Sequence, residues 1–278
     1  LQQPDDVVIL IPRGFHKTTI ANVYYTIWKF TKDISCRFLI ASKTRDVSER
    51  FLHATKRQIL TNRKFQSLYP YVHPAKGRGN LKYELWSKDK ILLERDVDAR
   101  EGLSITAMGA GQTLTGMHYD HQTYDDIMTP DNARTPEKRQ GIKTWYDETQ
   151  PLLDPGGRRV IIGTPYGTDD IYAYVEEMEN LPVYLRSAIE DDKYIWDEPE
   201  IIEKVEKERS KLPPSTFSSQ YLCRTYDEET AELRADWIKK WRVEDVVRGY
   251  TIKSGSSSSP DYFSSEMDKN DLITKLEE

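Results

Sequence analysis

The order of apolar and polar positions predicts alternating strands and helices over most of the chain. An apolar strand at residues 7–11 runs into a turn and then into a helix with apolar residues at helical spacing. A second strand at residues 37–41 precedes a charged helix from about residue 44 to residue 60. A strand, a turn, a helix and a second strand in this order are typical of the first unit of a doubly wound parallel sheet.

The helix after the first turn carries one apolar stripe. Its members recur at i, i+3, i+4, i+7 and i+8, and they are Ile20, Val23, Tyr24, Ile27 and Trp28. Because residues at this spacing share one side of an α-helix, we expect the whole stripe to pack against the sheet.

Further strands and helices follow along the chain. Strands are expected at residues 104–108, 121–124, 159–162 and 183–185, and at residues 83–86 and 90–94, which form a hairpin around a turn at residues 87–89. Helices are expected at residues 136–150 and 198–212. Residues 237–241 close the packed part, and the serine-rich and acidic chain from about residue 243 is expected to be a linker or a tail.

The composition excludes some classes of protein. The 278 residues hold no apolar run close to the length of a membrane span, so no association with a membrane is expected. Cys36 and Cys223 are far apart, which argues against a disulfide framework and favours a reducing compartment. The net charge of −6 argues against a surface coated in basic residues, but it is compatible with a local basic patch that contacts nucleic acid.

The turn after the first strand has the layout of a phosphate-binding loop. Backbone N–H groups of such a turn point at a phosphate, and the following helix adds the positive end of its dipole. Lys17 is expected to reach the outer phosphates and Thr18 to hold Mg²⁺. The residues of this candidate site are Pro12, Arg13, Gly14, Phe15, His16, Lys17, Thr18 and Thr19. The consensus has Gly where this chain has Ile11 and His16, so only the Lys-Thr half of the motif matches. The alternative to a phosphate-binding loop is a strand followed by a helix that carries a surface lysine.

Two adjacent acids follow the strand predicted at residues 121–124. Phosphate hydrolysis on such a sheet needs one acid to hold Mg²⁺ and another to orient or deprotonate water. We assign Asp125 to the metal ion and Asp126 to the water, because adjacent side chains at a strand end point in opposite directions. The alternative is an ordinary turn, since acids are common in turns and this strand is polar for a buried one. Thr164, after the strand at residues 159–162, stands where a hydroxyl would sense the terminal phosphate, and an ordinary loop entry is the alternative.

Several motifs together resemble the large terminase subunit of tailed bacteriophages, over roughly residues 7–241. They are Pro12-Arg13-Gly14-x-x-Lys17-Thr18-Thr19, Gly109-x-Gly111 with Gly116, Asp125-Asp126-Ile127, Ile161-Ile162-Gly163-Thr164-Pro165, Asp170-Ile171-Tyr172, and Phe217-Ser218-Ser219-Gln220-Tyr221-Leu222 followed by Trp237-Ile238. The last of these does not belong to a generic ATP-binding site, which makes the similarity more specific. The resemblance implies an ATP-driven motor that pumps viral DNA into an empty capsid.

The fold implied by this resemblance is α/β. It is a P-loop NTPase of the ASCE type, with a central mainly parallel sheet flanked by helices and a small lid subdomain. The implied parts are an ATPase core at residues 1–180, a lid at residues 181–242 and a linker or flexible tail at residues 243–278. ATP and Mg²⁺ are the implied cofactors. By similarity, Arg13 would contact the γ-phosphate within the same subunit, and Thr164 would couple hydrolysis to movement.

The same resemblance implies partners and a location. Double-stranded DNA, the portal protein and the small terminase subunit are the expected partners, and a ring of identical subunits, a pentamer in the family, is expected on the capsid. The expected location is the cytoplasm of the host cell, outside the mature virion. The family's nuclease has no counterpart in this sequence, and the residues that contact adenine are expected before Leu1.

The chain departs from the family pattern at three positions. His16 replaces a glycine, and Asp126 replaces a glutamate, which shortens the water-positioning acid by one methylene. Thr115 stands where many relatives have an arginine finger that reaches into the neighbouring subunit. The other candidates for this finger are Arg100, Arg134 and Arg139.

Other interpretations of the charged and aromatic residues were compared with these. A metal site at His118, Asp120 and His121 is disfavoured, because residues three apart on a strand face opposite sides. Lys76-Gly77-Arg78 could contact the DNA backbone from a loop, whereas the charged run at residues 204–211 is expected to be a solvated helix face. The aromatic residues are expected to pack in the core or the lid and not to stack on bases. For the whole chain, the alternatives are another ATP-driven nucleic-acid enzyme, such as a helicase, and a module that binds nucleotide without hydrolysing it.

Overall fold

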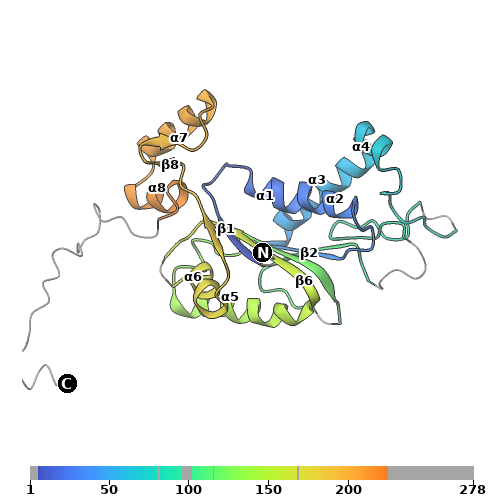
Figure 1. The fold of residues 1–278 in the computed structure, drawn as a ribbon. Coiled ribbons are helices and arrows are strands. Elements are labelled where there is room, and N and C mark those ends of the chain that lie inside the picture. The colour runs from blue at the N-terminus through green and yellow to red at the C-terminus, as the bar shows by residue number, and fades with distance from the viewer. Residues whose placement is uncertain (1–5, 80–81, 96–101, 115, 168, 225–278) are drawn as a thin grey trace, which may run out of the picture. The chain divides into compact units, whose positions relative to one another are not determined.

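A mainly parallel sheet of seven strands lies at the centre of the described part of the chain (Figure 1). The computed structural model describes residues 6–79, 82–95, 102–114, 116–167 and 169–224. These residues belong to the first of two compact units, Leu1–Asp227, and the second unit, Glu228–Glu278, lies outside them. The segment predicted at residues 237–241 and the predicted tail therefore also lie outside the described residues.

Neighbouring strands of the sheet are parallel with one exception. The strand order is β3-β4-β2-β5-β6-β1-β7, and the pair β3–β4 is antiparallel. The bounds are β1 Val7–Leu10, β2 Phe38–Ser42, β3 Lys90–Ile91, β4 Ile105–Gly109, β5 Tyr119–Asp125, β6 Leu153–Gly163 and β7 Val183–Leu185. A separate antiparallel pair consists of β8 (Ile189–Glu190) and β9 (Lys193–Tyr194). The prediction of a central, mainly parallel sheet is confirmed.

Helices cover both faces of this sheet. Their bounds are α1 Lys17–Thr19, the π-helix η1 Ile20–Tyr25, α2 Thr26–Phe30, α3 Arg45–Thr61, α4 Arg63–Leu68, α5 Pro136–Thr149, the 3₁₀-helix η2 Gln150–Leu152, α6 Ile171–Glu179, α7 Pro199–Lys211 and α8 Pro214–Tyr221. In Figure 1, α1, α2 and α3 lie on one side of the sheet, and α5 and α6 lie on the other. The central strands are therefore buried on both faces, as in other parallel sheets.

Successive residues of β2 show how the core is divided between the two faces. Phe38 packs in one apolar cluster with Leu52 of α3, and the next residue, Leu39, packs in a second cluster with Tyr146 of α5. This alternation follows from the two-residue period of a strand. The sheet thus holds two apolar layers, and polar side chains collect where its strands end.

The predicted apolar stripe of the first helix is wrong for three of its five members. Ile20, Tyr24 and Trp28 are more than half exposed, whereas Val23 and Ile27 are buried. The π-helical segment η1 shifts the residues after Ile20 around the helix axis, which accounts for the exposure of Tyr24 and Trp28. The buried face instead includes Asn22, a polar residue whose amide bonds to an acid at the end of β5.

Other differences concern short elements. The predicted turn at residues 87–89 exists, because Ser87 N donates to Lys90 O at 2.9 Å, but β3 forms its ladder with β4 and only an isolated bridge with Trp86. The strands β5 and β6 begin at Tyr119 and Leu153, earlier than predicted. The helices α4, α6 and α8 were not predicted, because each is short and lacks a long apolar period.

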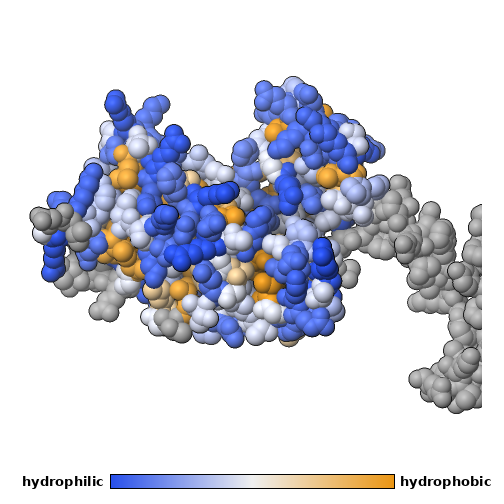
Figure 2. All heavy atoms as spheres, turned by 180° about the vertical axis from the view of Figure 1, so that it is seen from behind, coloured by the Kyte–Doolittle hydropathy of each residue, from blue (hydrophilic) through white to orange (hydrophobic). Residues whose placement is uncertain are grey.

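Figure 2 shows one face of the molecule, which is mainly hydrophilic with small, separate hydrophobic patches. Among the described residues, no helix combines the length and the apolar character that crossing a membrane requires. Cys36 and Cys223 are both buried and carry free thiols.

Candidate active site

The loop between β1 and α1 is shaped by two residues in the left-handed region. Gly14 has a φ of 84° and His16 a φ of 57°. His16 is the residue that stands in place of the consensus glycine, so it adopts the backbone conformation that glycine would adopt. A non-glycine residue adopts this conformation at a cost of about 1 kcal/mol. The sequence thus departs from the consensus at a position whose backbone conformation favours glycine.

Lys17 begins α1 and points back across the loop. Its ammonium donates to Ile11 O at 2.9 Å and lies 4.0 Å from Asp126 Oδ1. The side chain is 8% exposed. Burial lowers the pKa of Lys17, and the nearby carboxylates of Asp126 and Asp125 oppose that shift. The site therefore places a partly desolvated cation where the loop and the strand end meet.

Asp125, the last residue of β5, is held from both sides by the helical stretch that follows the loop. Its Oδ1 accepts from Thr18 Oγ1 at 3.0 Å, and its Oδ2 accepts from Asn22 Nδ2 at 3.1 Å. Burial raises the pKa of Asp125 to about 7, and the charge of Asp126 adds to this effect. The two hydrogen bonds and the nearby Lys17 ammonium oppose this shift without cancelling it.

These donors fit Mg²⁺. This ion takes oxygen ligands and is usually held by one or two carboxylates together with waters and substrate phosphates. Asp125 and Thr18 present a carboxylate and a hydroxyl oxygen 3.0 Å apart, and the raised pKa of Asp125 indicates a carboxylate that a cation would stabilise. Asn22, the second partner of Asp125, was missed by sequence reasoning. No consensus position marks it, and its burial depends on η1.

Asp126 leaves β5 in a left-handed turn. Its φ is 47°, and its backbone N donates to Ile162 O on β6 at 2.9 Å. The turn brings this carboxylate to Lys17, while Asp125 contacts Thr18. Among the described residues, Asp126 Oδ1 is buried without a hydrogen-bond partner. Both acids thus adjoin the loop between β1 and α1 and its following helix, as the sequence interpretation requires.

Thr164 lies directly after β6 and is 1% exposed. The loop that it begins is tied to α6 by Asp170. The carboxylate of Asp170 accepts from the backbone N of Tyr166 at 2.8 Å and of Tyr172 at 2.9 Å. Asp170 is thus the N-cap of α6 and also an anchor of the loop.

Arg13 is exposed on the loop. Its backbone N donates to Gln220 O of α8 at 3.0 Å. Burial raises the pKa of the Tyr166 hydroxyl, and the nearby Arg13 guanidinium opposes that shift. The side chain therefore lies toward the segment that follows Thr164.

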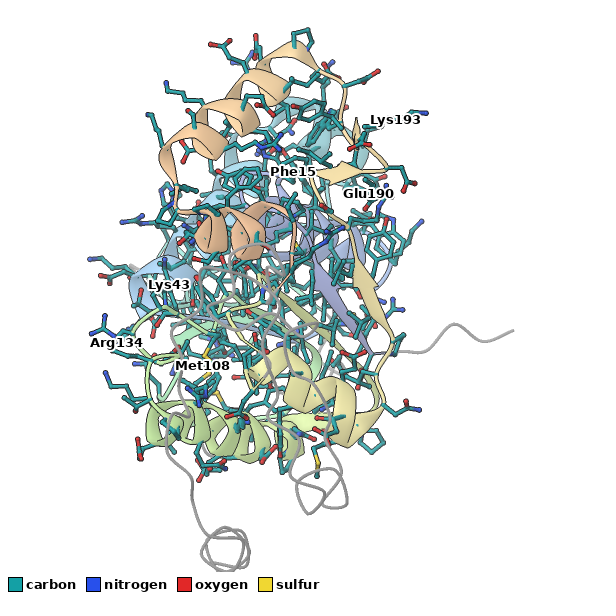
Figure 3. All side chains as sticks on the ribbon, turned by 90° about the vertical axis from the view of Figure 1, so that its left-hand side faces the viewer. Phe15, Lys43, Met108, Arg134, Glu190 and Lys193 are labelled. Carbon is teal, nitrogen blue, oxygen red and sulfur yellow. The ribbon has the colours of Figure 1, made fainter. Side chains whose placement is uncertain are left out.

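The small C-terminal elements pack onto the same loop. Phe15, labelled in Figure 3, belongs to an apolar cluster with Val205 of α7 and Phe217 of α8. Its ring centroid lies 5.7 Å from that of Trp196. A Cβ at Gly14 would lie 2.5 Å from the ammonium of Lys204 on α7. A side chain at position 14 would therefore meet two obstacles, the positive φ and the close approach of Lys204. Sequence reasoning treated Lys204 as part of a solvated face and missed this contact.

The other sequence candidates lie elsewhere. Arg139 pairs with Asp169 at 3.0 Å, and Arg134 lies in the loop between β5 and α5 (Figure 3). Arg100 and Thr115 are outside the described residues. Lys76 forms an isolated bridge with Tyr83.

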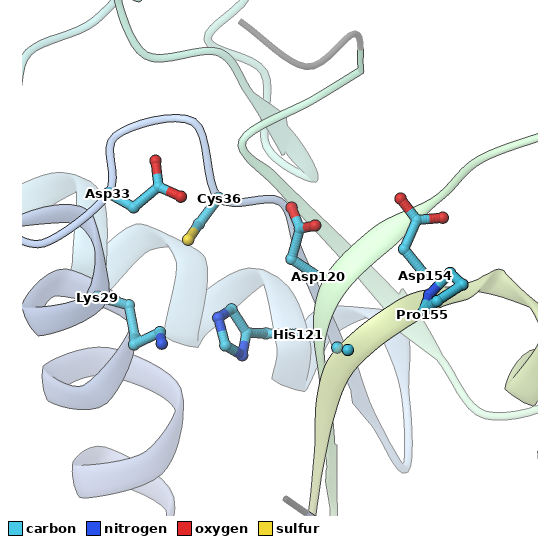
Figure 4. A pocket seen from close by; sticks show the side chains of 9 residues that line it. Lys29, Asp33, Cys36, Asp120, His121, Asp154 and Pro155 are labelled. Carbon is cyan, nitrogen blue, oxygen red and sulfur yellow. The ribbon is translucent and has the colours of Figure 1, made fainter.

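The polar residues at the start of β5 line a separate cavity of about 490 Å³ (Figure 4). The cavity lies at the amino ends of β5 and β6, so it is at the opposite edge of the sheet from Lys17. Asp120 accepts from Arg37, and the His121 ring stacks on Phe38 at 4.6 Å. Burial lowers the pKa of His121 to about 4. Within the described ranges, no group of three or more His, Cys, Asp or Glu side chains could hold a metal ion.

Comparison with known proteins gives a match at the level of the fold. No family model and no curated protein matches the chain. The ATPase domain of the large terminase of Thermus phage P74-26 is similar in structure, with a TM-score of 0.51 and 18% sequence identity over 80% of this chain and 89% of that domain. The large terminase of the thermophilic bacteriophage D6E, solved in complex with ADP, gives a TM-score of 0.46 and 12% identity over 81% of this chain. The chain spans about half the length of the D6E protein, namely 52%.

The similarity to the P74-26 domain shows that the chain has the fold of a phage large terminase ATPase domain. The predicted fold class, α/β with a central, mainly parallel sheet flanked by helices, is confirmed, and the predicted resemblance is confirmed at the level of the fold.

Proposed function

We propose that the chain hydrolyses ATP with Mg²⁺, and that this hydrolysis drives viral double-stranded DNA into an empty capsid, as the ATPase part of a terminase large subunit. One observation carries the proposal. Lys17 and the acids Asp125 and Asp126, which are far apart in sequence, meet at the carboxyl edge of one parallel sheet, with Lys17 Nζ 4.0 Å from Asp126 Oδ1. Ligands of open α/β sheets bind at this edge.

Each side chain has a role that follows from its position. The backbone of residues 12–16 and the ammonium of Lys17 would bind the phosphates, and Thr18 and Asp125 would hold Mg²⁺. The ion would neutralise charge on the phosphate oxygens. Asp126 would orient the attacking water and accept its proton, and Arg13 would bind the γ-phosphate from the exposed side of the loop.

Coupling to movement would use the contacts of the loop with its neighbours. Thr164 belongs to a loop that Asp170 ties to α6, and the backbone of Arg13 bonds to Gln220 of α8. A change at the γ-phosphate would therefore act on the β6–α6 loop and on the C-terminal helices together. The lid at residues 181–242 is part of this proposal.

The partners follow from the same proposal. They are double-stranded DNA, the portal protein and the small terminase subunit, with a ring of identical subunits on the capsid in the host cytoplasm. An arginine from a neighbouring subunit would complete each site, with Arg100, Arg134 and Arg139 as the candidates. The loop that holds Lys76 and Arg78 is the candidate contact to the DNA backbone.

Substitution of Lys17 tests the catalytic part. Lys17→Ala should abolish ATP hydrolysis, because it removes the cation on the phosphates. Lys32→Ala, which removes a lysine after α2, is the matched control and should keep full activity. Phosphate release and thermal melting should be measured on both variants. Undiminished hydrolysis by folded Lys17→Ala would refute the assignment.

Substitution of Asp126 separates binding from turnover. Asp126→Asn should bind ATP with Mg²⁺ in calorimetry and should not hydrolyse it, because an amide cannot accept the proton of water. If the unmodified chain also binds ATP without hydrolysing it, the chain is a nucleotide-binding module. Unwinding of duplex DNA by the isolated chain would favour a helicase instead.

A further inference from the structure

Tyr172 of α6 carries a buried hydroxyl without a partner. The side chain is 2% exposed, and among the described residues its Oη has no hydrogen-bond partner. Its ring lies directly on Gly163, because a Cβ at that position would overlap the hydroxyl and the ring. For packing alone, a phenylalanine would fill the same space without an unpaired polar atom, and burying such an atom is unfavourable.

At the same strand ends, two more buried polar atoms have no hydrogen-bond partner among the described residues. They are Asp126 Oδ1, which lies 4.0 Å from the Lys17 ammonium, and Thr164 Oγ1. Asp126 is fixed there by the bond from its N to Ile162 O, and Thr164 follows Gly163 directly. Burial raises the pKa of Tyr172 well above its usual range, and Asp126 is the neighbouring charge with the largest effect on it. The hydroxyl therefore keeps its proton and can donate.

We propose that Tyr172, Asp126 and Thr164 together hold one water molecule, and that this water attacks the terminal phosphate of ATP. Three partners are the usual number for a buried water. Tyr172 Oη donates to the water, which in turn donates its two protons to Asp126 Oδ1 and Thr164 Oγ1. The second lone pair of the water oxygen then stays free for the attack.

This inference rests on the proposed ATPase activity and deepens it. The water oxygen forms a bond to the terminal phosphorus while the bond from that phosphorus to the bridging oxygen breaks. The electron pair of the broken bond stays on ADP. One proton of the water passes to Asp126 and is later lost to solvent, and the phosphate leaves. Tyr172 keeps its proton throughout, so its role is to position the water.

The test uses Tyr172→Phe in the full chain. This variant keeps the ring on Gly163 and removes only the hydroxyl. The rate of a single turnover should fall about 10- to 100-fold, because a water that loses one of its three partners is held less well in line for the attack. The affinity for ATP with Mg²⁺ should stay within about twofold, because the hydroxyl does not bind the phosphates. The melting temperature should not fall, because an unpaired hydroxyl contributes nothing to the stability of the free protein.

Tyr146→Phe is the matched control. Tyr146 is another fully buried tyrosine of the same apolar cluster, but its hydroxyl accepts from Arg159 Nη1 at 3.0 Å. Its removal should lower the melting temperature and leave the turnover rate unchanged.

The outcomes separate the inference from the proposed function. Hydrolysis by Tyr172→Phe at the rate of the unmodified chain overturns the inference and leaves the ATPase proposal standing. A lowered melting temperature or a lost affinity for ATP in Tyr172→Phe also overturns it, because the hydroxyl would then be structural. An unmodified chain that hydrolyses no ATP refutes the proposed function and the inference with it.

Discussion

Replacing Asp125 with asparagine should stabilise the metal-free protein at high pH and leave it unchanged at low pH. Burial raises the pKa of Asp125 from its ordinary value of 3.8 to about 7 in the folded chain. Between about pH 4 and pH 7 the folded chain therefore binds more protons than the unfolded chain, and its stability falls as the pH rises through this window. Above pH 7 the whole cost of the buried charge is present.

The size of the effect follows from the same values. Each pKa step of one corresponds to about 1.4 kcal/mol, so ionised Asp125 destabilises the folded chain by at most about 4 kcal/mol at pH 8. The asparagine side chain of the variant carries no charge and avoids this cost. Asn22 can rotate its amide to match the new side chain, because its Oδ1 lacks a partner among the described residues. A domain of this size gains about 2–4 °C in melting temperature per kcal/mol.

The assay is thermal melting of both proteins at pH 5 and pH 8 in the presence of a chelator. Asp125→Asn should melt several degrees higher at pH 8, and the difference should be less than half as large at pH 5, where about a third of the cost is already present. Asp120→Asn is the control of opposite sign. Asp120 accepts from the Arg37 backbone N at 2.9 Å and from the Arg37 Nε at 3.1 Å, so this substitution should destabilise the protein at both pH values. If the melting temperatures of Asp125→Asn and the unmodified chain differ by the same amount at both pH values, the reasoning is refuted. The expectation that a metal ion offsets the cost of the buried Asp125 charge then fails with it.

Two further predictions concern the backbone of the site. Gly163→Ala should lower the free energy of unfolding by about 1–3 kcal/mol in a denaturant titration, because its Cβ would overlap Tyr172. Gly167→Ala, whose Cβ would meet nothing within 4 Å, should change it little, and equal effects of the two would contradict the packing argument. At position 16, His16→Gly should be more stable than His16→Ala by about 1 kcal/mol in thermal melting, because the φ of 57° disfavours a Cβ. Equal stability of these two variants would mean that the loop relaxes.

Much of the candidate site was predictable because its elements are local in sequence. The apolar strand before Lys17 and the acids after β5 are visible as short patterns of hydropathy and residue type. Parallel strands place their carboxyl ends at one edge, so the meeting of Lys17 with Asp125 and Asp126 followed from the predicted topology. The polar residues of β5 were unexpected in a buried strand. The structure explains Gln122, whose buried side-chain amide donates to Thr149 O at 3.0 Å.

The remaining features depend on contacts between distant residues. Asn22 is buried because η1 rotates it toward Asp125, and the same rotation exposes Tyr24 and Trp28, which hydropathy alone assigned to the core. The hydropathy pattern does not indicate where the Tyr172 ring lies. The ring fits there because Gly163 has no side chain.

The sequence by itself determined the order of most strands and helices, the candidate phosphate-binding loop and the positions of the two acids. Hydropathy period and residue type are local properties, and they suffice for these features. Only the tertiary structure decided which polar atoms of the described residues are paired and which are left without a partner. That outcome depends on the burial and orientation of side chains from β5, β6 and α6 at the same time, and no single stretch of sequence contains it.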